Sequence, residues 1–173
     1  MVAAAAARIA SNPLAIIVPR HPERGDEIAR QLALRRVARR SAGDTIGPET
    51  GVYLADTMGE VGLFLRLAPF AIIGGGFSPE IGGHNPMEAA NLGIGVVTGR
   101  HVANHAEMYG ELVAAGAALM AGDEMELTAQ VAALLADATR QAAMAAAAAA
   151  YSEAQSGQLS AALELLRPLL PAP

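Results

Sequence analysis

The stretch GGGFSPEIGGHNPMEAANLG, residues 74–93, gathers residue types that could bind an anion. Glycines let main-chain N–H groups approach a bound group closely, and such N–H groups attract phosphate or carboxylate. Glu88 lies one helical turn beyond Asn85 and could accept hydrogen bonds from two neighbouring ribose hydroxyls. A structural interpretation stays open, because glycines also make tight turns and Glu88 could complete a capping box with Asn85.

Charged residues in two other segments offer similar chemistry. Arg20 follows the apolar run LAIIV, and its guanidinium could pair with a phosphate or carboxylate. Glu60 ends the segment DTMGE and could contact a ligand, or it could simply stabilise the first turn of a helix. Arg20 could equally be an ordinary surface arginine. His21 and His84 could each donate a hydrogen bond to a ligand.

Six short apolar runs must position these residues, and they alternate with segments of helical periodicity. This alternation predicts a doubly wound, Rossmann-like parallel sheet with helices on both faces. Ligands bind such sheets at the carboxyl ends of the strands, which is where the polar segments lie. The predicted strands cover residues 14–18, 37–39, 51–55, 70–73, 95–98 and 118–120. The predicted helices cover 22–34, 58–67, 85–92 and 103–115, and a helical region from Asp123 to Pro168 breaks near Ser156-Gly157.

Composition narrows the functional classes. The chain has 173 residues, 53% of them hydrophobic and 17% charged, which predicts one folded domain. No apolar run reaches the roughly 18–20 residues of a membrane-spanning helix. The net charge of −5 argues against non-specific nucleic-acid binding, and the absence of cysteine excludes disulfides and thiolate catalysis.

Several common motifs are incomplete in this chain. The dinucleotide fingerprint G-x-G-x-x-G begins at Gly93 but meets Thr98 where its third glycine belongs. A phosphate-binding Walker sequence needs a lysine, and the chain has none. His101 and His105 have the spacing of a metal-binding pair but lack a third ligand. We therefore expect no metal and no cofactor.

The polar segments together resemble a known family. The resemblance to 3-deoxy-D-manno-octulosonic acid (Kdo) transferases, which add Kdo to lipid A in lipopolysaccharide synthesis, covers most of residues 14–120. The elements GGHNP-x-E and LADT-x-GE are its most specific parts. The segments that carry it are IIVPRHPER (16–24), VARRS (37–41), VYLADTMGEVGLFLRLAP (52–69), IIGGGFSPEIGGHNPMEAANLG (72–93) and VVTGRHVANHAEMY (96–109).

The resemblance implies an inverting glycosyltransferase of the GT-B architecture, with two Rossmann-like halves. This chain would be the C-terminal, donor-binding half: a single domain over residues 1–173, with 122–173 as a packed helical tail. The donor would be CMP-Kdo, and the acceptor a lipid A precursor at the cytoplasmic face of the inner membrane. The N-terminal half, with its catalytic glutamate and acceptor surface, would be absent. The isolated chain would then bind nucleotide without transferring sugar, and no residue in it would be catalytic.

The resemblance also implies a role for individual residues. Arg20 would hold the phosphate or carboxylate of the donor, and Glu88 would grip the ribose hydroxyls. The nucleotide pocket would be lined by Met58, Gly59 and Glu60. The phosphate would be received by Gly75 and Gly76 with the main-chain N–H groups of Gly83, His84 and Asn85.

Four residues depart from the family's pattern. Gly76 stands where serine is usual, so one hydroxyl contact to the donor would be missing. Leu65 replaces a tyrosine, Arg100 a proline and His105 a phenylalanine. Two other functions remain open: a stand-alone nucleotide-sugar binding module without turnover, and a GT-B relative that uses a UDP-sugar.

Overall fold

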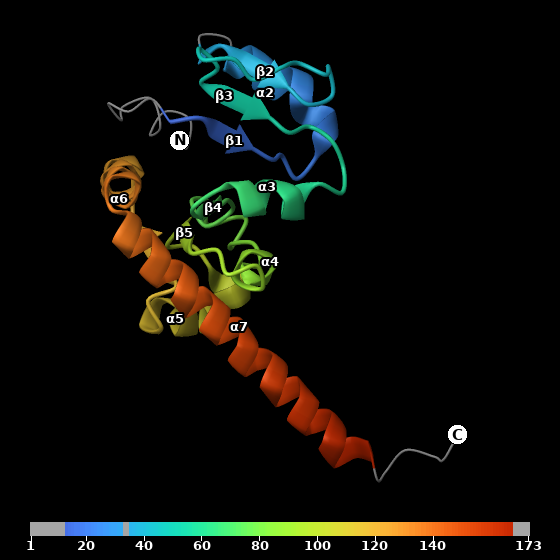
Figure 1. Ribbon diagram of the computed structural model, residues 1–173, viewed down its shortest axis with the longest axis vertical. Helices are drawn as coiled ribbons and strands as arrows, with labels where there is room; N and C mark the ends of the chain where they lie inside the picture. Colours follow the sequence, from blue (N-terminus) through green and yellow to red (C-terminus); the bar gives the residue numbers. More distant parts are fainter. Residues whose placement is uncertain (1–12, 33–34, 168–173) are drawn as a thin grey trace. The chain divides into compact units, whose positions relative to one another are not determined.

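The computed structural model describes residues 13–32 and 35–167, and for residues 158–164 it describes the backbone alone. The chain divides into two compact units (Figure 1). The first unit comprises Met1–Ala68 and Ala121–Ala138, and the second comprises Pro69–Met120 and Thr139–Pro173. Each unit has its own strands and helices, so each is described by itself.

The first unit is built on three parallel strands in the order β1-β3-β2. β1 spans Ala15–Ile17, β2 spans Val37–Arg39 and β3 spans Val52–Leu54. The central strand β3 is buried along its whole length, as expected for an apolar strand between two neighbours. Ile17 and Arg39 both stand opposite Leu54, so all three strands end at the same edge.

Helices of the first unit follow its strands. η1 spans Pro22–Arg24, α2 Gly25–Gln31, α3 Val61–Leu67 and α6 Glu124–Ala136. Phe64 of α3 packs into a core cluster with Tyr53, Ala38 and Ala55. At the start of α6, where the sequence predicts that helix begins, the Asp123 carboxylate accepts the Glu126 N–H at 2.8 Å and caps the helix.

The second unit contains strands in the order β4-β5-β6. β4 spans Ala71–Ile73, β5 Val96–Gly99 and β6 Ala118–Ala121; α4 spans Met87–Ala90, η3 Ala103–His105, α5 Ala106–Ala114 and α7 Ala138–Leu166. β4 and β5 pair in parallel, and β5 is buried throughout. Each strand of both units lies within two residues of its predicted bounds. Their parallel pairing and flanking helices make a Rossmann-like α/β fold, as predicted.

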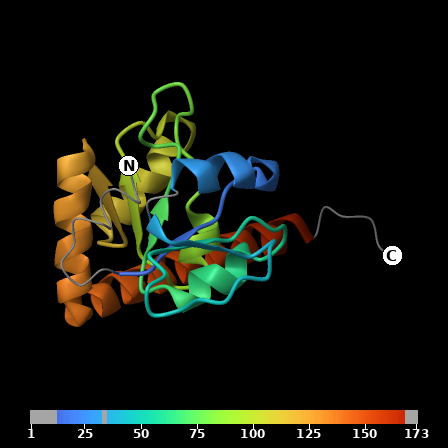
Figure 2. The ribbon, with the colours of Figure 1, turned by 90° about the horizontal axis from the view of Figure 1, so that it is seen from above.

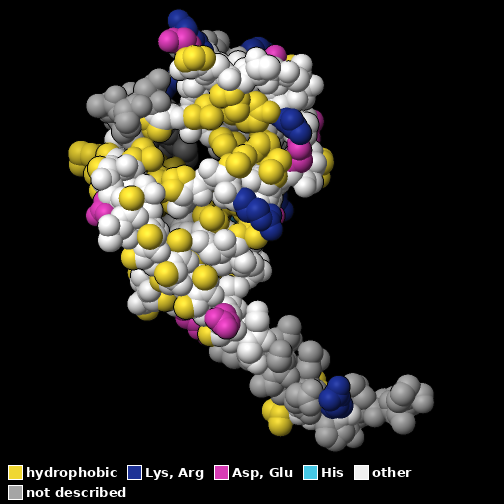
Figure 3. All heavy atoms as spheres, in the orientation of Figure 1, with side chains coloured by type: hydrophobic (Ala, Val, Ile, Leu, Met, Phe, Trp, Pro, Cys, Tyr) yellow, Lys and Arg dark blue, Asp and Glu magenta, His cyan; other side chains and the backbone are white. Residues whose placement is uncertain are grey.

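The helical tail differs from its prediction in one respect. The break lies at Asp137, between α6 and α7, and not near Ser156-Gly157, where α7 continues without interruption. Met144 and Ala148 of α7 are buried. Figure 3 shows hydrophobic side chains in several separate patches on the face that it draws. Among the described residues no helix has the length and apolarity needed to span a membrane.

Candidate functional site

The loop that follows β4 holds two glycine clusters in close contact. Gly75 has φ +82°, in the left-handed region that favours glycine. A Cβ on Gly75 would lie 3.1 Å from the His84 ring, so that ring covers the first cluster. A Cβ on Gly76 would lie 2.5 Å from the Thr98 hydroxyl oxygen, because residue 76 packs against the end of β5. A serine at position 76 therefore does not fit this backbone, which is a physical reason for the departure noted above.

The second glycine cluster is held from behind by its carbonyl groups. Gly82 and Gly83 have φ +70° and φ +86°. The Asn104 side chain donates to the Ile81 carbonyl at 2.8 Å, and the Asn104 N–H donates to the Gly82 carbonyl at 3.0 Å. In Figure 2 the loop, coloured green, arches out beside the start of α5. The loop is thus anchored to η3 through main-chain oxygens.

These anchors leave main-chain N–H groups available. Within the described part of the chain, no hydrogen bond takes the N–H of Gly83, His84 or Asn85. Successive main-chain N–H groups without partners can together bind an anion where the backbone turns them to one side. Of the five residues that the resemblance assigns to the phosphate, these three have N–H groups with no partner among the described residues.

The Asn85 side-chain oxygen accepts the Met87 N–H, the first of α4, at 2.8 Å, although the N-cap position itself is Pro86 and not Asn85 as predicted. The helix itself ends at Ala90, two residues short of the prediction, and continues as a turn. Glu88 is exposed and has no hydrogen bond or ion pair with another described residue. The capping box with Asn85 does not form, so the Glu88 carboxylate is available to a ligand.

The predicted residues of the first unit follow its adjacent strands. Arg20 is exposed between β1 and η1, and no ion pair joins it to another residue within 13–32 or 35–167. Met58 is 78% exposed and Gly59 has φ +81°, so both lie in a turn after β3. Because β1 and β3 pair in parallel, Arg20 and this turn leave the same edge of the sheet.

Glu60 stabilises the turn at residues 57–59 through hydrogen bonds to its carboxylate. Arg40 donates to the Glu60 carboxylate through Nη2 at 2.7 Å and Nε at 3.1 Å, and the Thr57 hydroxyl donates to it as well. The hydrogen bond from Arg40, followed by that from Thr57, lowers the pKa of Glu60 to about 2. Glu60 is therefore ionised, and both of its carboxylate oxygens already accept hydrogen bonds from Arg40. A ligand could use only the remaining lone pairs of these oxygens.

The structure contains a buried ion pair, Arg39–Asp56, that the sequence analysis does not predict. Asp56 has a side chain only 1% exposed, and Arg39 donates to it through Nε at 2.9 Å and Nη2 at 2.6 Å. The Ser41 N–H and hydroxyl donate to the same carboxylate. Burial alone would raise the pKa of Asp56, but the hydrogen bonds from Ser41 and Arg39 together lower it. The sequence offers one indication of this ion pair: Arg39 and Asp56 are charged residues of opposite sign at the ends of two apolar strands.

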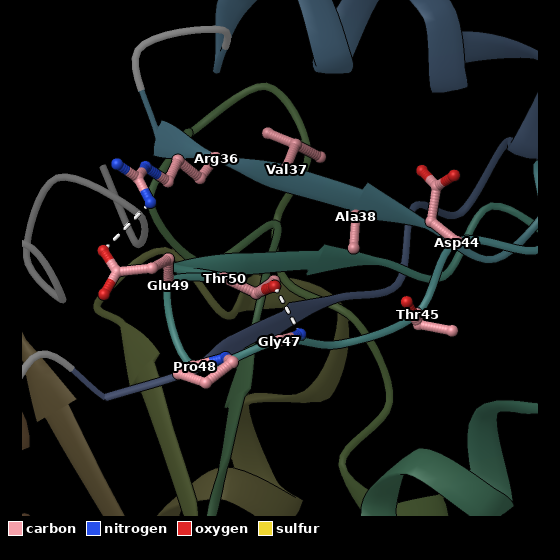
Figure 4. A pocket seen from close by; sticks show the side chains of 9 residues that line it. All are labelled: Arg36, Val37, Ala38, Asp44, Thr45, Gly47, Pro48, Glu49 and Thr50. Carbon is pink, nitrogen blue, oxygen red and sulfur yellow. Dashed lines mark hydrogen bonds and ion pairs between the residues drawn. The ribbon is translucent and has the colours of Figure 1, made fainter.

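An open pocket of about 380 Å³ lies along β2 and the loop after it (Figure 4). Two of its charged groups pair with each other: Arg36 donates to Glu49 at 2.9 Å. The Gly47 N–H donates to the Thr50 hydroxyl at 2.9 Å. None of the predicted site residues lines this pocket.

Comparison with known proteins gives three informative matches. The chain is 40% identical over 158 residues to 3-deoxy-D-manno-octulosonic acid transferase of Bordetella pertussis, a match that covers 90% of the chain and 37% of that relative. It is 43% identical over 100 residues to the probable mitochondrial enzyme of the same name from Arabidopsis thaliana, covering 56% of the chain and 22% of the relative. Its structure matches the C-terminal CMP-Kdo binding domain of WaaA from Acinetobacter baumannii with a TM-score of 0.71 and 36% identity, covering 77% of the chain and 70% of that domain.

The chain belongs to the Kdo transferase family. This confirms the resemblance that the segments around PRH, DTMGE and GGHNP predict. No family model matches the chain. The chain spans about two fifths or less of the length of these curated Kdo transferases.

Proposed function

We propose that this Kdo transferase chain binds CMP-Kdo and presents it as the donor in an inverting transfer to a lipid A precursor. The match to a domain described as CMP-Kdo binding, 36% identical over 77% of the chain, is the observation that carries the proposal. The available N–H groups in the second unit support it independently, since a single phosphate links the cytidine to the sugar.

The second unit would hold the phosphate and the ribose. The N–H groups of Gly83, His84 and Asn85 would donate to phosphate oxygens, and the turn at Gly75 and Gly76 would leave room for them. Charge on the phosphate grows as its bond to the sugar breaks, and donors already fixed in place stabilise that charge without reorganising. The Glu88 carboxylate would accept the two ribose hydroxyls.

The first unit would contribute the residues that follow β1 and β3. Arg20 would pair with the phosphate or with the carboxylate of Kdo, as a guanidinium fork suits either group. Met58 and Gly59 would line the nucleotide pocket. Glu60 would keep their turn in shape through Arg40 and Thr57, with any direct ligand contact a secondary role.

A calorimetric titration of the chain with CMP and with UDP tests the proposal. CMP is expected to bind more tightly. Glu88→Ala should weaken CMP binding about 5- to 150-fold, the value of losing hydrogen bonds worth about 1–3 kcal/mol. Glu107→Ala is the matched control, because Glu107 also lies in the first turn of a helix of the second unit.

Each outcome separates one interpretation from another. Tighter binding of UDP would favour a transferase that uses a UDP-sugar. Unchanged affinity in Glu88→Ala would remove Glu88 from the site, and no binding of either nucleotide would refute the proposal.

We further propose that the isolated chain does not transfer Kdo and that the whole enzyme works at the cytoplasmic face of the inner membrane. Inversion needs a base on the side of the sugar opposite the leaving phosphate, to deprotonate the attacking hydroxyl. The family resemblance assigns that base to an N-terminal half. Incubating the chain with CMP-Kdo and a lipid A precursor should give no transfer. Formation of the Kdo-modified product would refute the proposal, because it would show that this chain suffices for transfer. If the chain binds CMP and no partner protein restores Kdo transfer, a stand-alone nucleotide-sugar binding module is favoured.

A further inference from the structure

Tyr109 of α5 makes a contact that the predicted site does not include. Its side chain is fully buried, and its hydroxyl donates to the His84 carbonyl at 2.8 Å. Burial raises the pKa of Tyr109 to about 12, so the hydroxyl remains a donor throughout the neutral range. The contact joins α5 to the middle of the loop that carries the available N–H groups.

Peptide geometry carries the effect of this contact to the next residue. The peptide unit between His84 and Asn85 is planar and trans, as no cis peptide occurs in the described chain. The His84 carbonyl and the Asn85 N–H therefore point in opposite directions across one rigid plane. A hydrogen bond that fixes the carbonyl on the α5 side also fixes the N–H on the other side.

The same geometry recurs two residues earlier. The Gly82 carbonyl accepts the Asn104 N–H at 3.0 Å, which directs the Gly83 N–H away from η3. Two peptide planes of the loop are thus set by two anchors, one from η3 and one from α5. Gly83 has φ +86° and can adopt this shape, but a glycine-rich segment needs such anchors to keep it.

We infer that Tyr109 is a positioning residue for the donor phosphate, because its hydroxyl orients the Asn85 N–H toward the bound anion. The inference rests on the proposed function, since it concerns the same phosphate. It assigns a role to a buried residue that would contact no part of the ligand.

The test compares CMP with cytidine, which lacks the phosphate, in calorimetric titrations of the full chain. The ratio of the two affinities measures the phosphate contribution alone. Tyr109→Phe should reduce that ratio about tenfold, the value of one misaligned hydrogen bond to a charged group, while cytidine affinity stays unchanged. Tyr151→Phe is the control: it also removes one tyrosine hydroxyl contact to α5, an exposed hydrogen bond to Glu111, and should leave the ratio unaltered.

The outcomes distinguish the two levels of inference. If the unaltered chain binds CMP no more tightly than cytidine, the phosphate site itself is refuted. If the chain prefers CMP and Tyr109→Phe keeps the full preference, or loses CMP and cytidine affinity equally, the positioning role alone is wrong. A measurement on the unaltered chain avoids dependence on the variant's folding. The NMR signal of the Asn85 N–H should shift with CMP and not with cytidine, and an unshifted signal would also overturn the inference.

Discussion

Replacing Arg39 by methionine removes the cation that neutralises the buried Asp56 carboxylate, while keeping a side chain of similar length. Two hydrogen bonds from Arg39 to Asp56 are lost, at 2.9 and 2.6 Å. Removing one partner of a buried pair costs about 3–5 kcal/mol. Because the Arg39 side chain is 27% exposed and Asp56 keeps both bonds from Ser41, we expect the lower end, about 3 kcal/mol.

Amide hydrogen exchange measures this loss where it occurs. About 3 kcal/mol corresponds to roughly 100-fold faster exchange of the amides of β3, whose strand adjoins Asp56. The amides of β5 belong to the other unit and serve as an internal reference. Arg36→Met is the control variant, because the Arg36–Glu49 pair is exposed and should contribute nothing measurable.

The loss of stability in Arg39→Met should depend on pH through the ionisation of Asp56. The folded-state pKa of Asp56 is lowered, so its stabilisation is complete above the unfolded value of about 3.9 and is lost as the pH falls toward the folded value. The deficit of Arg39→Met should therefore be largest near neutral pH and shrink below about pH 4. A double variant with Asp56→Asn should lose less than the sum of the two single variants. Additive losses, or a deficit no larger than that of Arg36→Met, would refute the assigned pairing.

Two further predictions concern the loops that carry the candidate site. Gly99→Ala should prevent stable folding of the second unit, because its Cβ would collide with the Gly76 carbonyl, whereas Gly110→Ala in an open helical position should stabilise it by about 0.5–1 kcal/mol. Circular dichroism during urea unfolding checks both, and a stable Gly99→Ala variant would contradict the close approach. Glu60 should remain ionised down to about pH 3 because its pKa is about 2, and Arg40→Met should raise that pKa toward the usual value near 4.3. A carboxyl-carbon NMR titration measures it, and an unchanged pKa would exclude Arg40 as the cause.

Apolar runs and turn residues predicted most of the fold. The strand at 37–39 is predicted to the residue, and the predicted start of a helix at Asn85-Pro86 lies within two residues of the first residue of α4, Met87. The predicted break near Ser156-Gly157 is wrong because the alanine-rich sequence has little periodicity and one glycine does not end an exposed helix. Gly157 costs an exposed helix only about 1 kcal/mol, which the alanines around it offset.

Tertiary contacts account for what the sequence left open. Arg39 and Asp56 lie 17 positions apart in the sequence, and Arg40 and Glu60 lie 20 apart. Both pairs form because β2 and β3 are neighbours in the sheet. The contact of Gly76 with Thr98 likewise depends on β4 pairing with β5. Spacing along the chain carries no information about such neighbours, so residues 39 and 56 were read as parts of separate segments.

The anchors of the 82–85 loop have a consequence for protein engineering. Tyr109 and Asn104 grip carbonyl oxygens, which every amino acid supplies, and so they place no demand on the side chain at position 84. A library that varies residue 84 would change the side chain that lies over Gly75. Substitutions at position 84 therefore leave both hydrogen-bonded anchors of the loop, from Tyr109 and Asn104 to its carbonyls, in place.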